Sequence, residues 1–318
     1  MTKSLPEHCK CLFSAPYEFL PKNLRDQFTE LMLTRFQEVW QAIELKADPA
    51  IEAWIVNPGQ HFIVDENILQ LFPNLKILIT PSTGTNHIDK QSCQKKNIRF
   101  LSLLDDRVAL ESISASAEYT FVLMMNCLRK VHRSWQQVQE GRWRRNEDFL
   151  RGHELMGKNV GLVGFGRIGR KLANYCEAFS AQVSFYDPYV ESKIQKKDSL
   201  NNLFECADIV CVCCQLNVDT KNMIKLSLLE KLKKNACFIN TSRGEVVCED
   251  DLATFLKKRP DVMAGLDVLH GETSNVHFQS PLLAQELKDQ VIITPHIAGL
   301  SHESQIKAAQ TALSLLKS

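Results

Sequence analysis

The stretch VGLVGFGRIGR, residues 160–170, predicts a strand that turns directly into a helix through Gly164, Gly166 and Gly169. In such a turn the first glycine permits the tight bend, the second lets backbone N–H groups approach a pyrophosphate, and the third lets the helix pack closely. Asp187 ends the next apolar run, VSFYD, about 20 residues further on, where a carboxylate accepts hydrogen bonds from an adenosine ribose. The pattern therefore predicts a dinucleotide site, with the phosphates at the N-terminus of the helix.

Length and charge narrow the class of protein. The chain has 318 residues, enough for about two domains with substantial cores. Its 38 Lys and Arg residues nearly balance its 37 Asp and Glu residues, which predicts no general attraction to nucleic acid or to an anionic membrane. Residues 1–16 lack the apolar core of a secretory signal, and no apolar stretch is long enough to span a bilayer. We therefore expect a cytoplasmic protein.

Eleven cysteines are scattered through apolar strand and helix patterns. In a chain without an export signal, such residues are typical of free buried thiols rather than disulfides. Cys211, Cys213 and Cys214 lie together, but alternate residues of a strand face opposite sides of a sheet, and no CxxC pair elsewhere completes a cluster. We therefore expect no metal ion.

Apolar runs alternate with helical patterns along the chain. In the first hundred residues the strand candidates are KCLFSA, EAWIVN, KILITP and RFLSL, and between them LRDQFTELMLTRF and ENILQLF have helical spacing. A helical segment from about 112 to 131 leads into strands at 159–164, 182–187, 208–214, 236–241, 262–268 and 291–295. Strands separated by helices indicate parallel sheets. The expected fold is therefore α/β, with two doubly wound parallel-sheet domains.

The C-terminal segment HESQIKAAQTALSLLK places Ile306, Ala309, Leu313 and Leu316 on one helical face, and no strand follows it. We expect this helix to pack back against the first domain. That domain is then discontinuous, with the second series of strands inserted in it. The crossings near 104–111 and 296–301 are the candidate hinges.

Four polar residues follow strands of the second series. Arg243 comes after ACFINTS, Asp267 lies near the end of VMAGLDV, Glu272 lies five residues later, and His296 follows VIITP. Ligands of an open parallel sheet bind outside the carboxyl ends of its strands, so these groups should gather near a nicotinamide. Arginine can hold a carboxylate through two parallel hydrogen bonds, and histidine can give or take a proton. A glutamate paired with that histidine would fix its tautomer and favour its charged form.

These residues resemble one family along nearly the whole chain. GLVGFGRIGRKLA, INTSRGEVVCEDDL, GLDVLHGET and TPHIAG, in this order, are similar to segments of the D-isomer-specific 2-hydroxyacid dehydrogenases, and STGTNHID is similar to their substrate loop. The resemblance implies a Rossmann-type NAD-binding domain of residues 108–297, inserted in a flavodoxin-like substrate-binding domain of residues 1–107 and 298–318. It implies a homodimer formed through the cofactor domains. It also implies an oxidoreductase that transfers hydride between NAD and C2 of a small 2-oxo or D-2-hydroxy carboxylate.

The resemblance further implies roles for individual residues. Arg243 would bind the substrate carboxylate and C2 oxygen, His296 would be the acid/base, and Glu272 would pair with the imidazole. Backbone N–H groups of Thr83 and Gly84, next to Ser82, would complete the carboxylate cradle, and Asp267 would bind the nicotinamide carboxamide. The residues expected at the cofactor are Gly164, Phe165, Gly166, Arg167, Ile168, Gly169, Asp187, Cys213, Thr220, Thr241, Asp267, His296 and Gly299.

The chain departs from the family pattern at positions that bear on substrate and cofactor. Thr273 stands where many relatives have proline, and His270 where they have an acidic residue. Cys213 and Gln215 replace a histidine and a proline in the loop beside the cofactor. The identity of the 2-oxo acid therefore stays open. NAD is expected rather than NADP, because Asp187 would repel a 2′-phosphate and no cation follows it until Lys193.

Two other functions stay open on the sequence. Transcriptional corepressors of this fold sense dinucleotides without turnover, and formate or phosphite oxidation uses the same scaffold.

Several isolated signals carry less weight: His87, His153 and His277 are expected at the surface in loops, and Asn240, in a formal glycosylation sequon, is expected to be unmodified.

Overall fold

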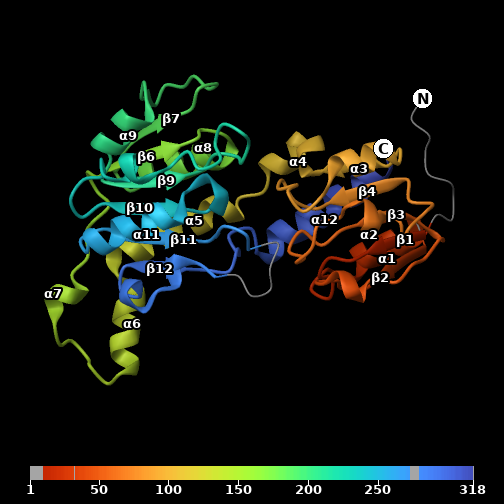
Figure 1. Ribbon diagram of the computed structural model, residues 1–318, viewed down its shortest axis with the longest axis horizontal. Helices are drawn as coiled ribbons and strands as arrows, with labels where there is room; N and C mark the ends of the chain where they lie inside the picture. The colour runs from red at the N-terminus through yellow and green to blue at the C-terminus, as the bar shows by residue number, and fades with distance from the viewer. Residues whose placement is uncertain (1–9, 32, 273–278, 318) are drawn as a thin grey trace. The chain divides into compact units, whose positions relative to one another are not determined.

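The structure is a computed structural model that describes residues 10–31, 33–272 and 279–317. The chain divides into two compact units. Of the described residues, those up to 113, Glu272 and 300–317 belong to the first unit, and 114–271 with 279–299 belong to the second. Each unit contains one parallel sheet with helices on both faces, so the predicted α/β fold class is confirmed (Figure 1).

The first unit is built on a five-stranded parallel sheet in the order β2-β1-β3-β4-β5. This is the flavodoxin-like order implied by the family resemblance. The strands are β1 (Lys10–Phe13), β2 (Leu33–Phe36), β3 (Ile51–Ile55), β4 (Ile77–Thr80) and β5 (Arg99–Ser102). The helices are α1 (Lys22–Leu31), α2 (Glu66–Leu69), α3 (Lys90–Lys95), α4 (Arg107–Glu111) and α12 (His302–Lys317), with short 3-10 turns η1 (Ala42–Glu44) and η2 (Leu103–Asp105).

Side chains alternate across this sheet, so each face has its own apolar core. Phe13 and Ile79 belong to the core shared with α1 and α12, whereas Leu12 and Trp54 belong to the core shared with α2 and α3. The buried positions of α12 in the first core are Ala309, Ala312, Leu313, Leu315 and Leu316, with Ile306 packed against them. The C-terminal helix therefore completes the core of the N-terminal sheet.

One strand of the first unit lies in a segment predicted to be helical throughout. Helix α1 ends at Leu31, and β2 pairs in parallel with β1 from Lys10 opposite Leu33 to Phe13 opposite Phe36. The helical prediction is therefore wrong for the last four residues of LRDQFTELMLTRF. A strand is stabilised by pairing with residues far away along the chain, and the local spacing of apolar residues does not report that pairing.

The second unit has a seven-stranded parallel sheet in the order β12-β11-β10-β9-β6-β7-β8. Counted from β6, this is the Rossmann order 3-2-1-4-5-6 with one more strand at the far edge. The strands are β6 (Asn159–Val163), β7 (Gln182–Tyr186), β8 (Gln195–Lys196), β9 (Ile209–Val212), β10 (Cys237–Asn240), β11 (Met263–Leu266) and β12 (Val291–Ile293). Apart from the two-residue β8, each lies within a predicted strand.

Helices α5 and α8 pack on one face of this sheet, and α9 lies against the opposite side of β6 and β7. The helices are α5 (Ala115–Arg129), α6 (Val131–Gln139), α7 (Glu147–Leu150), α8 (Arg167–Ala178), α9 (Leu200–Cys206), α10 (Leu226–Leu229) and α11 (Glu249–Lys258), with 3-10 turns η3 (Gly244–Val246), η4 (Pro281–Leu283) and η5 (Gln285–Leu287). The ten cysteines of the described residues are free thiols, and four of them lie in the α5–α8 core. No helix in the described ranges is long and apolar enough to cross a membrane.

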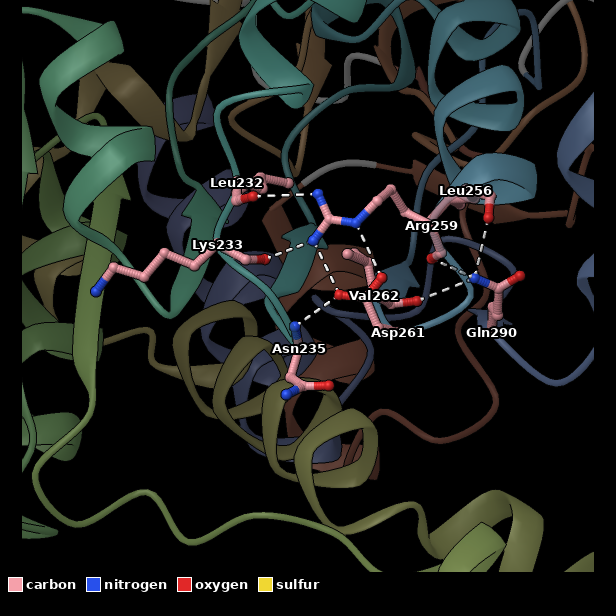
Figure 2. Close-up of polar contacts among 8 residues, drawn as sticks. All are labelled: Leu232, Lys233, Asn235, Leu256, Arg259, Asp261, Val262 and Gln290. Atoms are coloured by element: carbon pink, nitrogen blue, oxygen red, sulfur yellow. Dashed lines mark hydrogen bonds and ion pairs between the residues drawn. The ribbon is translucent and has the colours of Figure 1, made fainter.

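A network of polar contacts ties together the segments that enter β10, β11 and β12 (Figure 2). Arg259 and Asp261 pair through two parallel bonds, Nε to Oδ1 at 2.9 Å and Nη2 to Oδ2 at 2.8 Å. The Asp261 carboxylate also accepts from the backbone N of Asn235 at 2.8 Å. The Gln290 amide donates to the carbonyls of Leu256, Arg259 and Val262. This network lies at the amino ends of the strands, so it aligns them and leaves their carboxyl edge open for other contacts.

Candidate active site

The glycine loop lies at the carboxyl end of β6, between that strand and α8. Gly164 has φ +94°, and a Cβ there would lie 2.8 Å from the backbone N of Cys214, so only glycine fits. A Cβ on Gly166 would meet no atom within 4 Å. The open space therefore lies next to the first turn of α8, whose N–H groups have no acceptor within the helix. That combination fits a dinucleotide pyrophosphate.

Asp187 supports this loop as well as facing it. Its Oδ2 accepts from the backbone N of Phe165 at 2.9 Å, and its Oδ1 accepts from the backbone N of Tyr189 at 2.9 Å. The Phe165 side chain is buried and stacks on Phe185, with ring centroids 4.1 Å apart. A carboxylate has about four lone-pair positions, so the two backbone bonds leave acceptor capacity for ribose hydroxyls.

The loop after β9 lies against the glycine loop, at the point where the strand order reverses. The backbone N of Cys213 donates to the carbonyl of Val163 at 2.8 Å. Burial raises the pKa of both thiols here, that of Cys214 to about 11, so they remain protonated and weakly nucleophilic at neutral pH. Thr220 organises the turn that follows, because its Oγ1 accepts from Asn217 N at 2.8 Å and lies 2.7 Å from the carbonyl oxygen of Gln215.

The loop after β10 presents Arg243. Asn240 is 1% exposed, and its amide nitrogen donates to the Arg243 carbonyl at 3.0 Å while its amide oxygen accepts from both the N and the Oγ of Ser242. The guanidinium of Arg243 is half-buried, with Nη1 2.5 Å from the carbonyl oxygen of Ser242. Asn240 is thus a positioning residue that sequence reasoning missed. The available signal was a buried amide at the end of an otherwise apolar strand.

Thr241, in the same loop, contacts α5 through its hydroxyl. Its Oγ1 lies 2.6 Å from Thr120 Oγ1, and Thr120 donates its own proton to the carbonyl of Ser116. Each hydroxyl has one proton, so Thr241 donates to Thr120. The hydroxyl of Thr241 therefore anchors the loop to the helix and retains acceptor capacity only.

The loops after β10 and β11 touch through their backbones. A Cβ on Gly244 would lie 2.1 Å from the carbonyl carbon of Leu269 and 2.4 Å from the N of His270. No side chain fits in that space. The position of Arg243 is therefore coupled to the segment that follows Asp267.

Asp267 holds the loop after β12, which contains His296. Its carboxylate is fully buried, with Oδ1 accepting from Thr294 Oγ1 at 2.5 Å and from Ile297 N at 3.0 Å, and Oδ2 accepting from Ala298 N at 2.8 Å. Its carbonyl accepts from His296 N at 2.8 Å. Burial raises the pKa of Asp267 even though these hydrogen bonds favour the carboxylate.

His296 itself has an unusual backbone. Its φ is +55°, in the left-handed region, which costs a non-glycine residue roughly 1–2 kcal/mol. The contacts to Asp267 on both sides of His296 hold it there, and its side chain is exposed. The motifs assigned Asp267 to the nicotinamide carboxamide and did not show its backbone contacts with the histidine loop. Gly299, also exposed, ends this loop.

The remaining predicted residues belong to the first unit. Ser82, Thr83 and Gly84 follow β4 and are half-buried, as is Glu272. The structure therefore brings Arg243, Asp267 and His296 to one sheet edge, while the pairing of Glu272 with His296 stays a prediction.

Two of the three minor histidines can be placed. His153 is exposed, as expected, but the prediction of a surface residue is wrong for His87, which is 3% exposed. The carbonyl of His87 accepts from Val64 N at 2.9 Å, and its ring Nε2 lies 3.0 Å from the buried Thr80 Oγ1. His277 and Thr273 lie outside the described residues.

Comparison with known proteins gives the same family that the motifs indicate. Residues 121–298, more than half of the chain, match the NAD-binding domain of the D-isomer specific 2-hydroxyacid dehydrogenases. A hydroxypyruvate reductase of Thermotoga maritima is 30% identical over 264 residues, which cover 82% of this chain and 82% of that protein. A glyoxylate reductase of Thermofilum pendens is 33% identical over 260 residues, covering 78% of this chain and 73% of that protein.

A solved structure extends the similarity to nearly the full length. The D-lactate dehydrogenase of Aquifex aeolicus, complexed with NAD and lactic acid, matches with a TM-score of 0.80 and 25% identity, covering 97% of this chain and 94% of that one. These relatives are enzymes, so a corepressor-like role is not favoured. The chain belongs to the D-isomer-specific 2-hydroxyacid dehydrogenase family and is an NAD-dependent oxidoreductase.

Proposed function

We propose that this chain reduces a small 2-oxo acid to the D-2-hydroxy acid with NADH, and catalyses the reverse reaction. The observation that carries the proposal is the linkage of three loops at one sheet edge. Gly244 brings the Arg243 loop against the backbone after β11, and Asp267 binds the His296 loop. An arginine for the carboxylate and a histidine for the proton are the groups that this reduction requires.

The glycine loop and Asp187 are the proposed NAD site. When bound, the nicotinamide supplies or accepts the hydride at substrate C2. The N–H groups at the start of α8 would receive the pyrophosphate, and Asp187 would accept from the ribose hydroxyls. The other residues proposed at the cofactor are Phe165, Arg167, Ile168, Cys213, Thr220, Thr241, Asp267, His296 and Gly299.

Arg243 is proposed to bind the substrate carboxylate and the C2 oxygen. The Asn240 amide holds the backbone on both sides of Arg243, which limits the positions its guanidinium can take. A planar guanidinium supplies two parallel donors and stabilises the negative charge that develops on the C2 oxygen during reduction. The N–H groups of Thr83 and Gly84 would bind the same carboxylate, with Ser82 shaping their loop.

His296 is proposed as the acid/base. In the reducing direction its imidazolium would donate a proton to the C2 oxygen, and in the oxidising direction its imidazole would accept one. Glu272 is proposed to bind the other ring nitrogen, which fixes the tautomer and favours the charged form. The Asp267 contacts hold the backbone of His296 in its left-handed conformation, so the ring starts from a fixed point.

The two units are proposed to divide the work. Residues 1–107 and 298–318 would form the substrate-binding domain, and residues 108–297 the NAD-binding domain. The matched family domain, residues 121–298, supports the second assignment. A cytoplasmic location is also proposed. The near balance of charge supports an enzyme of small molecules without nucleic-acid or membrane partners.

The second unit is proposed to form a homodimer through an apolar surface on and after α6. Val131, Trp135 and Val138 are 54%, 62% and 44% exposed and lie on one helical face, and Trp143 is 75% exposed. Exposed apolar patches of this kind are typical of protein interfaces. Light scattering should give twice the mass of the chain, and Trp135→Glu should give the mass of one chain. A monomeric wild-type protein at micromolar concentration would contradict the dimer.

An assay of NADH consumption against a panel of 2-oxo acids tests the proposed function. The panel should include glyoxylate, pyruvate and hydroxypyruvate, with the matching D and L hydroxy acids, formate and phosphite tested against NAD. We expect turnover of a 2-oxo acid and of the D isomer only. NADH binding without turnover of any member would favour a sensor, and formate or phosphite oxidation would assign the other enzymatic activity.

A further inference from the structure

Three side chains beneath the loop after β4 form a continuous line of hydrogen bonds. His87 Nε2 lies 3.0 Å from Thr80 Oγ1, and Thr80 Oγ1 lies 3.1 Å from Ser82 Oγ. Ser82 Oγ donates to the carbonyl of Gly84 at 2.6 Å. Thr80 is fully buried and His87 is 3% exposed. The line therefore runs from the interior of the first unit to the loop that holds Thr83 and Gly84.

Counting protons sets the direction of every bond in this line. A hydroxyl has one proton to donate. Ser82 gives its proton to the Gly84 carbonyl, which is an acceptor only, so Ser82 must accept from Thr80. Thr80 has then used its own proton and must accept from His87. The Nε2 of His87 therefore carries a hydrogen, and the sequence of donors is His87, Thr80, Ser82.

Backbone contacts hold both ends of the loop. The Ser82 carbonyl accepts from Leu103 N at 3.2 Å, and the His87 carbonyl accepts from Val64 N at 2.9 Å. Between these anchors lies Gly84, whose backbone has more freedom than that of any other residue type. The bond from Ser82 to the Gly84 carbonyl spans this segment. It limits the φ and ψ angles that aim the N–H groups of Thr83 and Gly84.

We propose that His87 is a positioning residue that acts through Thr80 and Ser82 to orient the two N–H groups that bind the substrate carboxylate. This inference rests on the role proposed above for Thr83 and Gly84. A buried imidazole that donates to Thr80 makes Ser82 an obligate donor to Gly84. Without that donor, the Thr80 hydroxyl can point its proton away from Ser82. The Ser82 hydroxyl is then no longer required to donate to the Gly84 carbonyl, and the loop loses the bond that fixes its shape. The effect falls on binding of the carboxylate rather than on hydride or proton transfer.

The first test compares Thr80→Val with Thr80→Ser. Valine keeps the shape and removes the hydroxyl, whereas serine keeps the hydroxyl. Oxamate, an unreactive analogue of a 2-oxo acid, measures binding of the carboxylate without turnover. For Thr80→Val we expect the KM for the 2-oxo acid to rise about tenfold, the effect of one buried hydrogen bond. The Kd of the NADH complex for oxamate should rise by the same factor. We expect kcat and Kd for NADH to stay near wild type, and Thr80→Ser to bind oxamate normally. Equal oxamate affinity in the two variants would overturn the proposal.

The second test reads the proton on His87 directly. Two-bond nitrogen–proton NMR spectra of the full chain labelled at histidine, with the His87 signals assigned from their loss in His87→Gln, should show hydrogen on Nε2. An Nε2 without hydrogen would overturn the proposed relay, the line of donors from His87 through Thr80 to Ser82. His87→Gln, which keeps a donor near the Nε2 position, should retain more oxamate affinity than His87→Leu, and equal losses would contradict the relay.

The two proposals fail in different ways. If the wild-type NADH complex binds no oxamate and turns over no 2-oxo acid, the proposed function is wrong, and the role of His87 at a carboxylate site is wrong with it. If the wild-type protein binds oxamate and Thr80→Val binds it equally well, only the relay is wrong.

Discussion

The carboxyl edges of the two sheets hold their loops in different ways. In the second unit, loops from different strands are locked to each other, by the backbone contact at Gly244 and by the buried Asp267 carboxylate. In the first unit, backbone contacts from Leu103 and Val64 hold the two ends of the loop after β4, and a line of side-chain bonds from His87 through Thr80 to Ser82 holds its middle.

The difference follows from what each edge must place. Arg243 and His296 come from separate strands, and a reaction that uses both side chains needs them fixed relative to each other. In the proposed site, the first unit would contribute only backbone N–H groups from one short loop, so the shape of that loop would be what matters. Damage to the locks of the second unit should therefore lower kcat. Damage to the relay of the first unit should raise KM.

The largest effect on activity should come from Asp267→Ala, which removes the carboxylate that holds the loop after β12. Three donors, Thr294 Oγ1, Ile297 N and Ala298 N, lose their buried acceptor, and the strained His296 backbone loses its support. We expect kcat/KM to fall about a thousandfold, on the order of 4 kcal/mol. Thr294→Val removes one of the three donors and should cost about tenfold. Steady-state kinetics of both variants would test this prediction. If Asp267→Ala kept kcat/KM within tenfold of wild type, the Asp267 contacts would not be what holds His296 in place.

The next effect should come from Arg243→Lys. A lysine ammonium keeps the charge but cannot form two aligned bonds to a carboxylate, so kcat/KM should fall by roughly a hundredfold, on the order of 3 kcal/mol. Arg144→Lys is the matched control, because the Arg144 side chain is 79% exposed and should tolerate the change. Near-normal turnover of Arg243→Lys would contradict the proposal that Arg243 binds the substrate carboxylate through two parallel hydrogen bonds.

Asp187 sharpens the comparison on the cofactor side. The wild-type protein should prefer NADH to NADPH by about a hundredfold in kcat/KM, because the negative charge of the Asp187 carboxylate repels the 2′-phosphate. Asp187→Ala should lower NADH use about tenfold, since the ribose acceptor and the bond to Phe165 N are both lost, with a smaller gain for NADPH. Equal use of the two cofactors by the wild-type protein would mean that another group neutralises the phosphate.

The motifs predicted the parts of the molecule that depend on local sequence. Gly164 and Asp187 follow from strand and turn patterns, and the order of strands follows from alternation with helices. Strand β2 could not be predicted, because its pairing with β1 overrides the helical spacing of its own residues. His87 was predicted at the surface for a related reason, since the local sequence does not show its backbone pairing with the distant Val64.

The contacts that hold the site were also hidden in the sequence. Asp267 was predicted as a cofactor ligand, but its carboxylate accepts from residues 27 to 31 positions further along the chain. Asn240 lies only three residues before Arg243, yet nothing in a linear pattern shows that its amide hydrogen-bonds to the backbone of both Ser242 and Arg243. The motifs predicted the groups that are proposed to do the chemistry. They did not show the groups that position them.

The smallest effect on activity should come from the amino edge of the second sheet, where Arg259 and Asp261 pair away from the site (Figure 2). The hydrogen bond from Arg259 lowers the pKa of Asp261 to about 2, below its ordinary value. The carboxylate therefore stabilises the fold above its ordinary pKa, by about 2 kcal/mol, and this contribution is lost as pH falls through about 2.

Asp261→Asn should keep kcat and KM near wild type while lowering the free energy of unfolding in urea at neutral pH. The difference between the two proteins should shrink as the pH is lowered toward about 3. A difference that stays constant with pH would show that the carboxylate charge is not what stabilises this edge.

The most direct test of the central claim is a turnover with NADH deuterated at both C4 positions, using whichever 2-oxo acid of the panel reacts fastest and gives a chiral product. Mass spectrometry locates the label, and chiral chromatography identifies the isomer. We predict a D-2-hydroxy acid that carries one deuterium at C2. A product of L configuration, or one without deuterium at C2, would contradict the assignment of this chain as a D-2-hydroxyacid dehydrogenase.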